Sequence, residues 1–114
     1  MQNRKVFKMS VNEYLETEAR IVGVLKSIYD PEIPVNVYDL GLIYEISVDE
    51  DKVAHITMTL TAPNCPMAEM IVEEVKYKVA GTKGVQECDF VLTFDPPWDK
   101  SMMTEEAKLE LGFL

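Results

Sequence analysis

Residues 42–61 contain the pattern that most constrains how this chain folds. Apolar residues alternate with mostly polar ones over 42–48 and again over 54–61. A period of two is typical of strands that bury one face, and the polar stretch 49–52 between them suits a turn. We therefore predict an antiparallel hairpin. The sole histidine, His55, falls on its polar face near the turn, so we expect a surface role for it.

Helical patterns flank this hairpin. Ser10 to Glu13 matches a capping box, and the helix that starts there should end at Asp30, because the residue before a proline leaves the helical region. Its expected apolar stripe is Val11, Tyr14, Leu15, Val22, Leu25, Ile28 and Tyr29. A second helix should start near Pro66 and end near Gly81. Its expected apolar face is Met67, Met70, Ile71, Val75 and Val79.

A third strand and a short last helix complete the pattern. Apolar side chains alternate again over 88–94, and we expect Cys88 to face the core there with Phe90 and Phe94. Two consecutive prolines make 95–99 a rigid turn, and a helix should follow over 104–112. The order helix, two strands, helix, strand, helix predicts a two-layer α+β domain, with helices packed on a small mixed three-stranded sheet.

Length and charge narrow the class of protein. The chain has 114 residues and an apolar content of 47%, which fits one globular domain. We assign residues 10–114 to that domain and the aperiodic residues 1–9 to a flexible arm. The net charge of -9, with no basic cluster, argues against nucleic acid and anionic membranes as partners. No apolar run is long enough to cross a membrane, and both cysteines should stay reduced, so we predict a cytoplasmic location.

The segment from Thr61 to Pro66 places Cys65 where a helix is expected to begin. Free N–H groups and the helix dipole favour an anion there, which lowers the pKa of a thiol toward the reactive thiolate. By residue type alone, a small, half-buried apolar residue is the favoured explanation of Cys65. The proline-rich loop before the hairpin carries Asp30, Glu32 and Asp39, which either serve as turn groups or converge on a site.

The chemistry available to Cys65 is limited by what surrounds it in the sequence. No Gly-rich phosphate loop, paired-histidine motif or Cys-x-x-Cys is present. Nucleophilic catalysis would need a base near the thiol, and only Asp30 or Glu32 could fold against it, since His55 lies at the other end of its strand. One thiol is too few for a stable iron–sulfur cluster, so a cluster would be shared between chains or with a partner's ligands.

Four motifs occur in order along the chain. They are Asp30–Pro34 with Tyr38–Tyr44, then Thr61–Pro66, then Asp95–Trp98, and finally Met103–Ala107 with Leu111–Gly112. Together they resemble the family of small iron–sulfur cluster assembly factors that includes SufT and PaaD, built on a MIP-type domain. The likeness is greatest to the stand-alone members of bacterial SUF systems.

The resemblance implies a non-catalytic factor in cluster assembly or in delivery to apo-proteins. Cys65 would act as the reactive thiol or as a ligand of a labile, shared iron–sulfur cluster. Asp30, Glu32 and Thr61 would line the same pocket, with Asp39 nearby. The implied partners are SUF assembly proteins, apo iron–sulfur proteins and a second copy of the chain.

Two other functions fit the same residues. Cys65 with Asp30 or Glu32 could belong to a cysteine-dependent enzyme or thiol transferase. Alternatively, Pro97 and Trp98 could be the partner-binding residues of a pure protein-interaction module, because a tryptophan beside a rigid turn is well suited to an interface.

Overall fold

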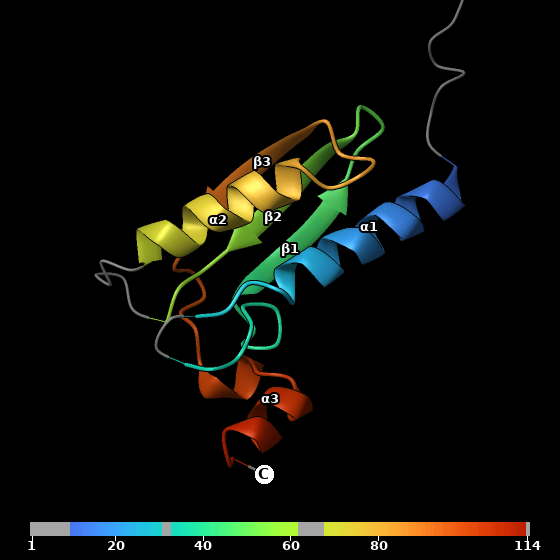
Figure 1. Cartoon of the computed structure of the whole chain (residues 1–114). Helices are drawn as coiled ribbons and strands as arrows, with labels where there is room; N and C mark the ends of the chain where they lie inside the picture. The colour runs from blue at the N-terminus through green and yellow to red at the C-terminus, as the bar shows by residue number, and fades with distance from the viewer. Residues whose placement is uncertain (1–9, 31–32, 62–67, 114) are drawn as a thin grey trace, which may run out of the picture.

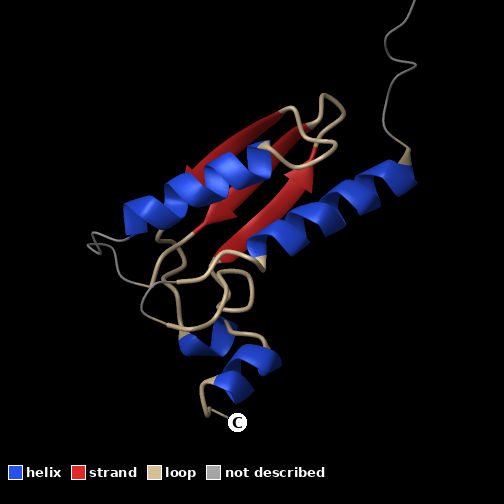
Figure 2. Cartoon of the chain, in the orientation of Figure 1, coloured by secondary structure: helices blue, strands red, loops and turns tan. Residues whose placement is uncertain are grey.

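The computed structural model of the chain describes residues 10–30, 33–61 and 68–113. Two helices, α1 (Val11–Leu25) and α2 (Ala68–Ala80), lie side by side on one face of a three-stranded sheet (Figures 1 and 2). The short helix α3 (Glu105–Glu110) lies beyond one end of that sheet. This arrangement confirms the predicted two-layer α+β architecture. Within the described residues, no helix combines the length and apolarity needed to cross a membrane.

The sheet comprises β1 (Ile43–Val48), β2 (Val53–Met58) and β3 (Glu87–Leu92), in that spatial order. β1 and β2 form the predicted antiparallel hairpin. β3 pairs in parallel with β2, and the connection between them contains α2 (Ala68–Ala80). The sheet is therefore mixed, as predicted, and β2 is its central strand.

The register of the sheet explains the core. Ile46 lies opposite Ile56, and Ala54 lies opposite Cys88, so these apolar side chains share the face that the helices cover. Ile56 and Ala54 are almost completely buried. Burying a side chain the size of isoleucine contributes about 1.5–3 kcal/mol, so this row stabilises the contact between the two layers.

Helix α1 spans Val11–Leu25 and begins at the predicted capping box. The Ser10 hydroxyl accepts a hydrogen bond from the Glu13 N–H at 3.1 Å, and the Glu13 carboxylate accepts one from the Ser10 N–H at 3.0 Å. The predicted apolar stripe is partly wrong. The buried row is Thr17, Ile21 and Leu25, while Val11 and Leu15 on its flank are 73% and 60% exposed.

The end of α1 also differs from the prediction, because the helix stops at Leu25 rather than Asp30. The Ser27 N–H donates to the Val24 carbonyl at 3.0 Å, and the Ile28 N–H donates to the Leu25 carbonyl at 3.2 Å. These i to i−3 bonds tighten the last turn and lead the chain out of the helix. The loop that follows enters the core, with buried side chains at Ile28, Val35, Val37, Leu40 and Leu42.

Helix α2 is described from Ala68, so its predicted start near Pro66 lies outside the described residues, as does Met67. Its buried face includes Ile71, Val75 and Val79, as predicted. Met70 is 64% exposed, which corrects the prediction that it packs in the core. The buried residues Ile71, Val75 and Val79 recur every four positions and form the face that packs in the core.

Strand β3 lies at an edge of the sheet, and this limits how much of it is buried. Cys88 and Phe90 pack against the core, as predicted. Leu92 and Phe94 are each 42% exposed, so the expectation that Phe94 reaches the core is wrong. The strand ends at Leu92, and an edge strand has a paired neighbour on one side only.

The C-terminal part crosses back over the loop that precedes β1. It contains a short 3-10 helix, η2 (Lys100–Met102), and α3 (Glu105–Glu110), which is shorter than the predicted 104–112. Thr104 caps α3, because its hydroxyl accepts from the Ala107 N–H at 3.2 Å. The Thr104 N–H in turn donates to the Asp39 carbonyl at 2.9 Å, which fixes α3 against the loop.

Candidate functional site

Three of the five predicted pocket residues are described. Asp30, Asp39 and Thr61 are placed by the structure, whereas Glu32 and Cys65 lie outside the described residues. The convergence of all five therefore stays a prediction. Thr61 is exposed, and it follows the buried Thr59 and Leu60 beyond the end of β2.

Asp30 acts as a turn residue at the start of the loop. Its carboxylate accepts a hydrogen bond from the Ile33 N–H at 3.1 Å, and its own N–H donates to the Val35 carbonyl at 3.3 Å. This is the local role that its residue type favours. The two bonds connect Asp30 to Ile33 and Val35, which lie further along the same loop.

Asp39 forms a reciprocal pair with Asn36 in the same loop. The Asp39 N–H donates to the Asn36 side-chain oxygen at 2.8 Å, and the Asn36 amide donates to the Asp39 carboxylate at 2.8 Å. Asn36 is only 8% exposed, whereas Asp39 is partly exposed. The two reciprocal bonds hold the turn from Asn36 to Asp39 in one conformation.

Asp39 also lines a polar pocket of about 190 Å³ between the loop and α3. The other lining residues are Tyr29, Pro34, Val35, Asn36, Glu106, Ala107 and Glu110. Three carboxylates and no lysine or arginine face this pocket, so it would attract cationic groups rather than anions. Among the predicted residues that are described, the structure brings only Asp39 to it.

Trp98 lines a second, apolar groove on the other side of the loop. The groove has a volume of about 350 Å³ and is lined by Ile33, Pro34, Leu40, Trp98, Lys100, Met103, Leu111 and Phe113. The Trp98 indole N–H donates to the Leu40 carbonyl at 2.7 Å, which satisfies its one polar atom and fixes the ring. Pro97 is exposed beside it. The predicted partner-binding residues therefore lie at the edge of an apolar concavity.

Gly41 allows the close approach of chain segments that builds this groove. Its φ is +81°, and a Cβ at this position would lie 2.3 Å from the Met102 carbonyl oxygen. Nearby, the Tyr44 hydroxyl donates to the Pro96 carbonyl at 2.8 Å. The C-terminal segment is thus fixed to the Leu40–Tyr44 region, which belongs to one of the four motifs.

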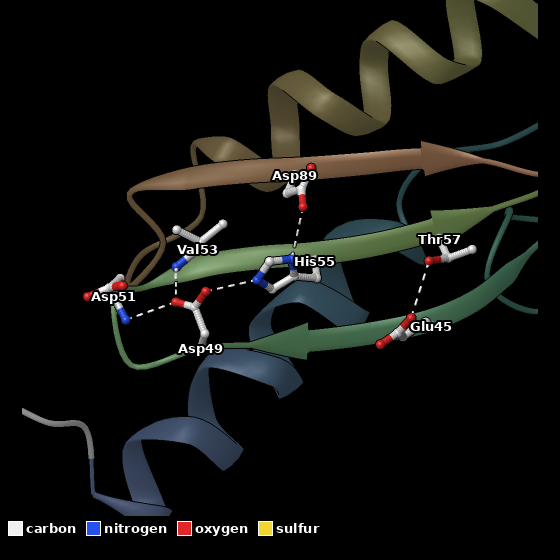
Figure 3. Close-up of polar contacts among 7 residues, drawn as sticks. All are labelled: Glu45, Asp49, Asp51, Val53, His55, Thr57 and Asp89. Carbon is white, nitrogen blue, oxygen red and sulfur yellow. Dashed lines mark hydrogen bonds and ion pairs between the residues drawn. The ribbon is translucent and has the colours of Figure 1, made fainter.

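His55 forms a polar bridge on the open face of the sheet, at the hairpin turn (Figure 3). Its Nε2 lies 2.8 Å from an Asp49 carboxylate oxygen and its Nδ1 lies 3.1 Å from one of Asp89. The hydrogen bond to Asp49 is the main cause of a raised His55 pKa, and Asp89 adds to it, while burial opposes the shift. This confirms the surface position predicted for His55.

Cys88 behaves as the structural thiol that was predicted. It is free and half-buried, and burial raises its pKa, with a further contribution from the negative charge of Asp89. A raised pKa disfavours the thiolate, which is the nucleophilic and metal-binding form. Within the described ranges, no group of three or more His, Cys, Asp or Glu side chains is arranged to hold a metal ion.

Thr59 lies just beyond β2, where the alternating pattern predicts the polar face of the hairpin. It is 0% exposed, and its hydroxyl has no hydrogen-bond partner, the one such case found among buried side-chain polar atoms of the described residues. In sequence it looks like one more polar residue on an alternating strand, so no pattern marks it. Its burial depends on the tertiary packing at the exit of β2.

Comparison with known proteins identifies the class to which this fold and loop arrangement belong. The sequence model of the family described as iron–sulfur cluster assembly protein matches residues 18–90. The chain therefore belongs to the iron–sulfur cluster assembly protein family, as its motifs predicted.

Individual relatives agree with this assignment. An iron–sulfur protein maturation auxiliary factor of Porphyromonas gingivalis is 60% identical over 103 residues, covering 90% of this chain and 98% of the relative. The maturation auxiliary factor SufT of Staphylococcus aureus is 38% identical, covering 75% of this chain and 97% of SufT. A crystal structure from Bacillus anthracis, described as domain of unknown function DUF59, superposes with a TM-score of 0.82 at 35% identity, covering 92% of this chain and all of that one.

Proposed function

We propose that this protein is a non-catalytic factor that helps to assemble iron–sulfur clusters or deliver them to apo-proteins. The observation that carries the proposal is the 60% identity to an iron–sulfur protein maturation auxiliary factor over 98% of that protein's length. Such coverage includes the loop with Asp30 and Asp39 and the exit of β2. The protein would act as an adaptor or as a transient cluster carrier.

Cys65 is the residue we propose for contact with the cargo. Asp30, Glu32 and Thr61 would surround it, with Asp39 nearby. Two features support this arrangement: the loop is fixed by its own hydrogen bonds, and Thr61 lies exposed where the Cys65 segment begins. A hydrogen-bonded loop beside Cys65 would suit a site that binds and then releases its cargo.

The cargo would be a labile iron–sulfur cluster. Such clusters are normally held by several thiolates, and Cys65 supplies one. The remaining ligands would come from Cys65 of a second chain in a homodimer or from a partner protein. Sharing ligands in this way leaves each chain with few bonds to break when the cluster moves on.

The proposed partners are SUF assembly proteins and apo iron–sulfur proteins in the cytoplasm. Pro97 and Trp98 are the candidate contact residues. The apolar groove beside Trp98 supports this proposal, because aromatic side chains next to concave apolar surfaces are frequent binding hot spots.

Anaerobic reconstitution with ferrous iron and sulfide tests the carrier role. We expect wild-type protein and Cys88→Ala to develop the visible absorbance of an iron–sulfur cluster, and Cys65→Ala to develop little. Cys88→Ala is the matched control, since it also removes a thiol but one that the structure shows to be half-buried. Equal absorbance in all three proteins would contradict a role for Cys65 in holding the cargo.

Anaerobic co-purification tests the adaptor role separately. Tagged wild-type protein should retain SUF components or apo iron–sulfur proteins, and Trp98→Ala should retain fewer of them. Leu109→Ala is a suitable control, because Leu109 is 67% exposed and does not line the Trp98 groove. Identical retention by Trp98→Ala and wild type would exclude the Trp98 contact.

A further inference from the structure

The Trp98 groove has an acidic cavity beside it that the proposed function does not use. Asp39, Glu106 and Glu110 line this acidic pocket, whose volume is about 190 Å³. Pro34 lines both cavities, and Glu110 in the acidic pocket is followed in the chain by Leu111 in the groove. A carboxylate-lined cavity and an apolar groove are therefore neighbours on the surface that the loop and α3 form together.

The charges on α3 are unfavourable for the helix itself. Glu106 and Glu110 are four residues apart, and like charges at this spacing destabilise a helix. Glu110 is also the last residue of α3, where the helix dipole disfavours a negative charge. Lys108 does not offset this, because residues two apart on a helix do not face each other. A lysine at position 110 would therefore suit the helix better than the glutamate does.

Helix α2 shows the opposite arrangement. Its Glu73 lies 3.5 Å from Lys76 and its Glu74 lies 2.6 Å from Lys78, so both carboxylates have a cation beside them. Among the residues that the structure describes, no ion pair is found for Glu106 or Glu110. Both are exposed, so their negative charge is accessible to a cationic group from another molecule.

The charge distribution also gives the surface a direction. Lys100 is the one charged residue among the described lining of the groove, and its ammonium lies 4.9 Å from the centroid of the Phe113 ring. A basic side chain would be repelled by Lys100 and attracted by the three carboxylates on the other side of Pro34. Complementary charges of this kind fix the register in which a partner binds.

We propose that the Trp98 groove and the acidic pocket form one docking surface for a protein segment that carries a large aliphatic side chain close to a lysine or arginine. The aliphatic side chain fills the groove, and the ammonium or guanidinium group enters the acidic pocket. An acidic segment is repelled, so the surface also selects against the wrong partner. The proposal rests on the proposed adaptor role for the identity of the partner, and it adds the chemistry by which that partner is recognised.

The fluorescence of Trp98 gives a direct test, because Trp98 is the only tryptophan of the chain and lines the groove. The probes are acetylated and amidated peptides with one leucine and one lysine in a glycine–serine background. The two residues are placed in both orders and up to about six residues apart, which spans roughly 20 Å. Matched peptides carry glutamate in place of the lysine, or glycine in place of the leucine.

We expect leucine–lysine peptides of at least one spacing to change the Trp98 emission of the wild-type protein in a saturable way. The matched glutamate peptide should bind about ten times more weakly, because an attraction becomes a repulsion. The peptide without leucine should cause no change. Glu110→Lys should bind the lysine peptide about ten times more weakly and lose the preference for lysine over glutamate.

Glu105→Lys is the matched control. It makes the same change of charge in the same helix, but Glu105 lines neither the groove nor the acidic pocket. Binding of the lysine peptide and its preference over the glutamate peptide should therefore stay close to wild type. Loss of the preference in Glu105→Lys would show that net charge alone decides binding, and would contradict a specific acidic pocket.

Thermal unfolding of the free proteins gives a second readout. Glu110→Lys should raise the unfolding midpoint by about 2 °C, because it removes the repulsion from Glu106 and places a cation at the end of α3. Stability and peptide binding then change in opposite directions, so the loss of binding is not a loss of folding. A lower midpoint would show that Glu110 stabilises the helix, and would contradict its assignment to partner binding.

Two further results would overturn the proposal. They are the absence of any saturable emission change up to about 5 mM peptide, and equal binding of the lysine and glutamate peptides by wild type. Neither result affects Cys65-dependent loading, so this failure is distinguishable from a failure of the carrier role. Peptide binding by a protein that fails the reconstitution and co-purification tests would leave the docking surface in place and remove its iron–sulfur role.

Discussion

At the scale of single residues, His55 makes the stability of the domain depend on pH. Its imidazole bridges Asp49 at the hairpin turn and Asp89 on β3, and so connects two elements that flank β2 (Figure 3). The Asp49 bond raises the His55 pKa, and the same bond lowers the Asp49 pKa. Both pKa shifts favour the ion pair between protonated His55 and ionised Asp49.

The two shifts define a window of pH. A raised histidine pKa means that its contribution is complete below the unfolded-state value of about 6.5 and is lost as the pH rises through the folded-state pKa. A lowered aspartate pKa means that its contribution is present above about 3.9 and is lost as the pH falls through its folded-state pKa. The bridge should therefore stabilise most between roughly pH 4 and 6.5.

His55→Gln should reduce this dependence. We expect the unfolding midpoint of wild type to fall more steeply from pH 6 to pH 8 than that of His55→Gln, with a small difference because the bridge is exposed. Thermal unfolding of both proteins in matched buffers from pH 6 to pH 8 measures this difference in slope. Parallel pH profiles for the two proteins would show that the bridge contributes nothing.

At the scale of elements, the contact between the loop and the C-terminal segment depends on Gly41. Gly41→Ala adds a Cβ to a residue with φ of +81° and places it 2.3 Å from the Met102 carbonyl oxygen. Gly112→Ala adds the same strain, since Gly112 also has φ of +81°, but its Cβ would meet no atom within 4 Å. The pair separates backbone strain from steric contact.

We expect Gly112→Ala to lower the free energy of unfolding by about 1 kcal/mol and Gly41→Ala to lower it by about 3 kcal/mol or more. Urea denaturation measures both values. Equal losses would mean that the C-terminal segment moves away from Gly41 at little cost, and that it is not firmly fixed to the loop.

The elements also show where sequence patterns succeed. The period-two stretches predicted β1, β2 and β3, and the capping box at Ser10 predicted the start of α1. The end of α1 was not predictable, because it depends on the Ser27 bond to the Val24 carbonyl and on the burial of Ile28. Similarly, the exposure of Phe94 follows from the edge position of β3, which local alternation does not reveal.

At the scale of the whole molecule, motif spacing predicted more than residue chemistry did. Asp30 and Asp39 look like turn residues by type, and the structure shows them in turn-like hydrogen bonds. The four motifs in order nevertheless predicted the family, which the match over residues 18–90 confirms. Neither residue type nor motif spacing predicted the buried, unpaired hydroxyl of Thr59, because its burial depends on the packing where the chain leaves β2.

The loop and the C-terminal segment meet at one end of the sheet. Both long helices lie on one face of the sheet, while the loop and the C-terminal segment are joined at the end where β2 leads toward Cys65 (Figure 1). The structure places the Trp98 groove against the same loop. A partner bound in that groove would contact the loop that carries Asp30 and Asp39.

The most direct test of the central claim is iron–sulfur enzyme activity in cells that lack this protein. Deletion should lower the activity of iron–sulfur enzymes without lowering the amount of their polypeptides. Wild type and Cys88→Ala should restore that activity, and Cys65→Ala, present at the same level, should not. Full restoration by Cys65→Ala, or unchanged enzyme activities after deletion, would contradict a Cys65-dependent role in cluster assembly or delivery.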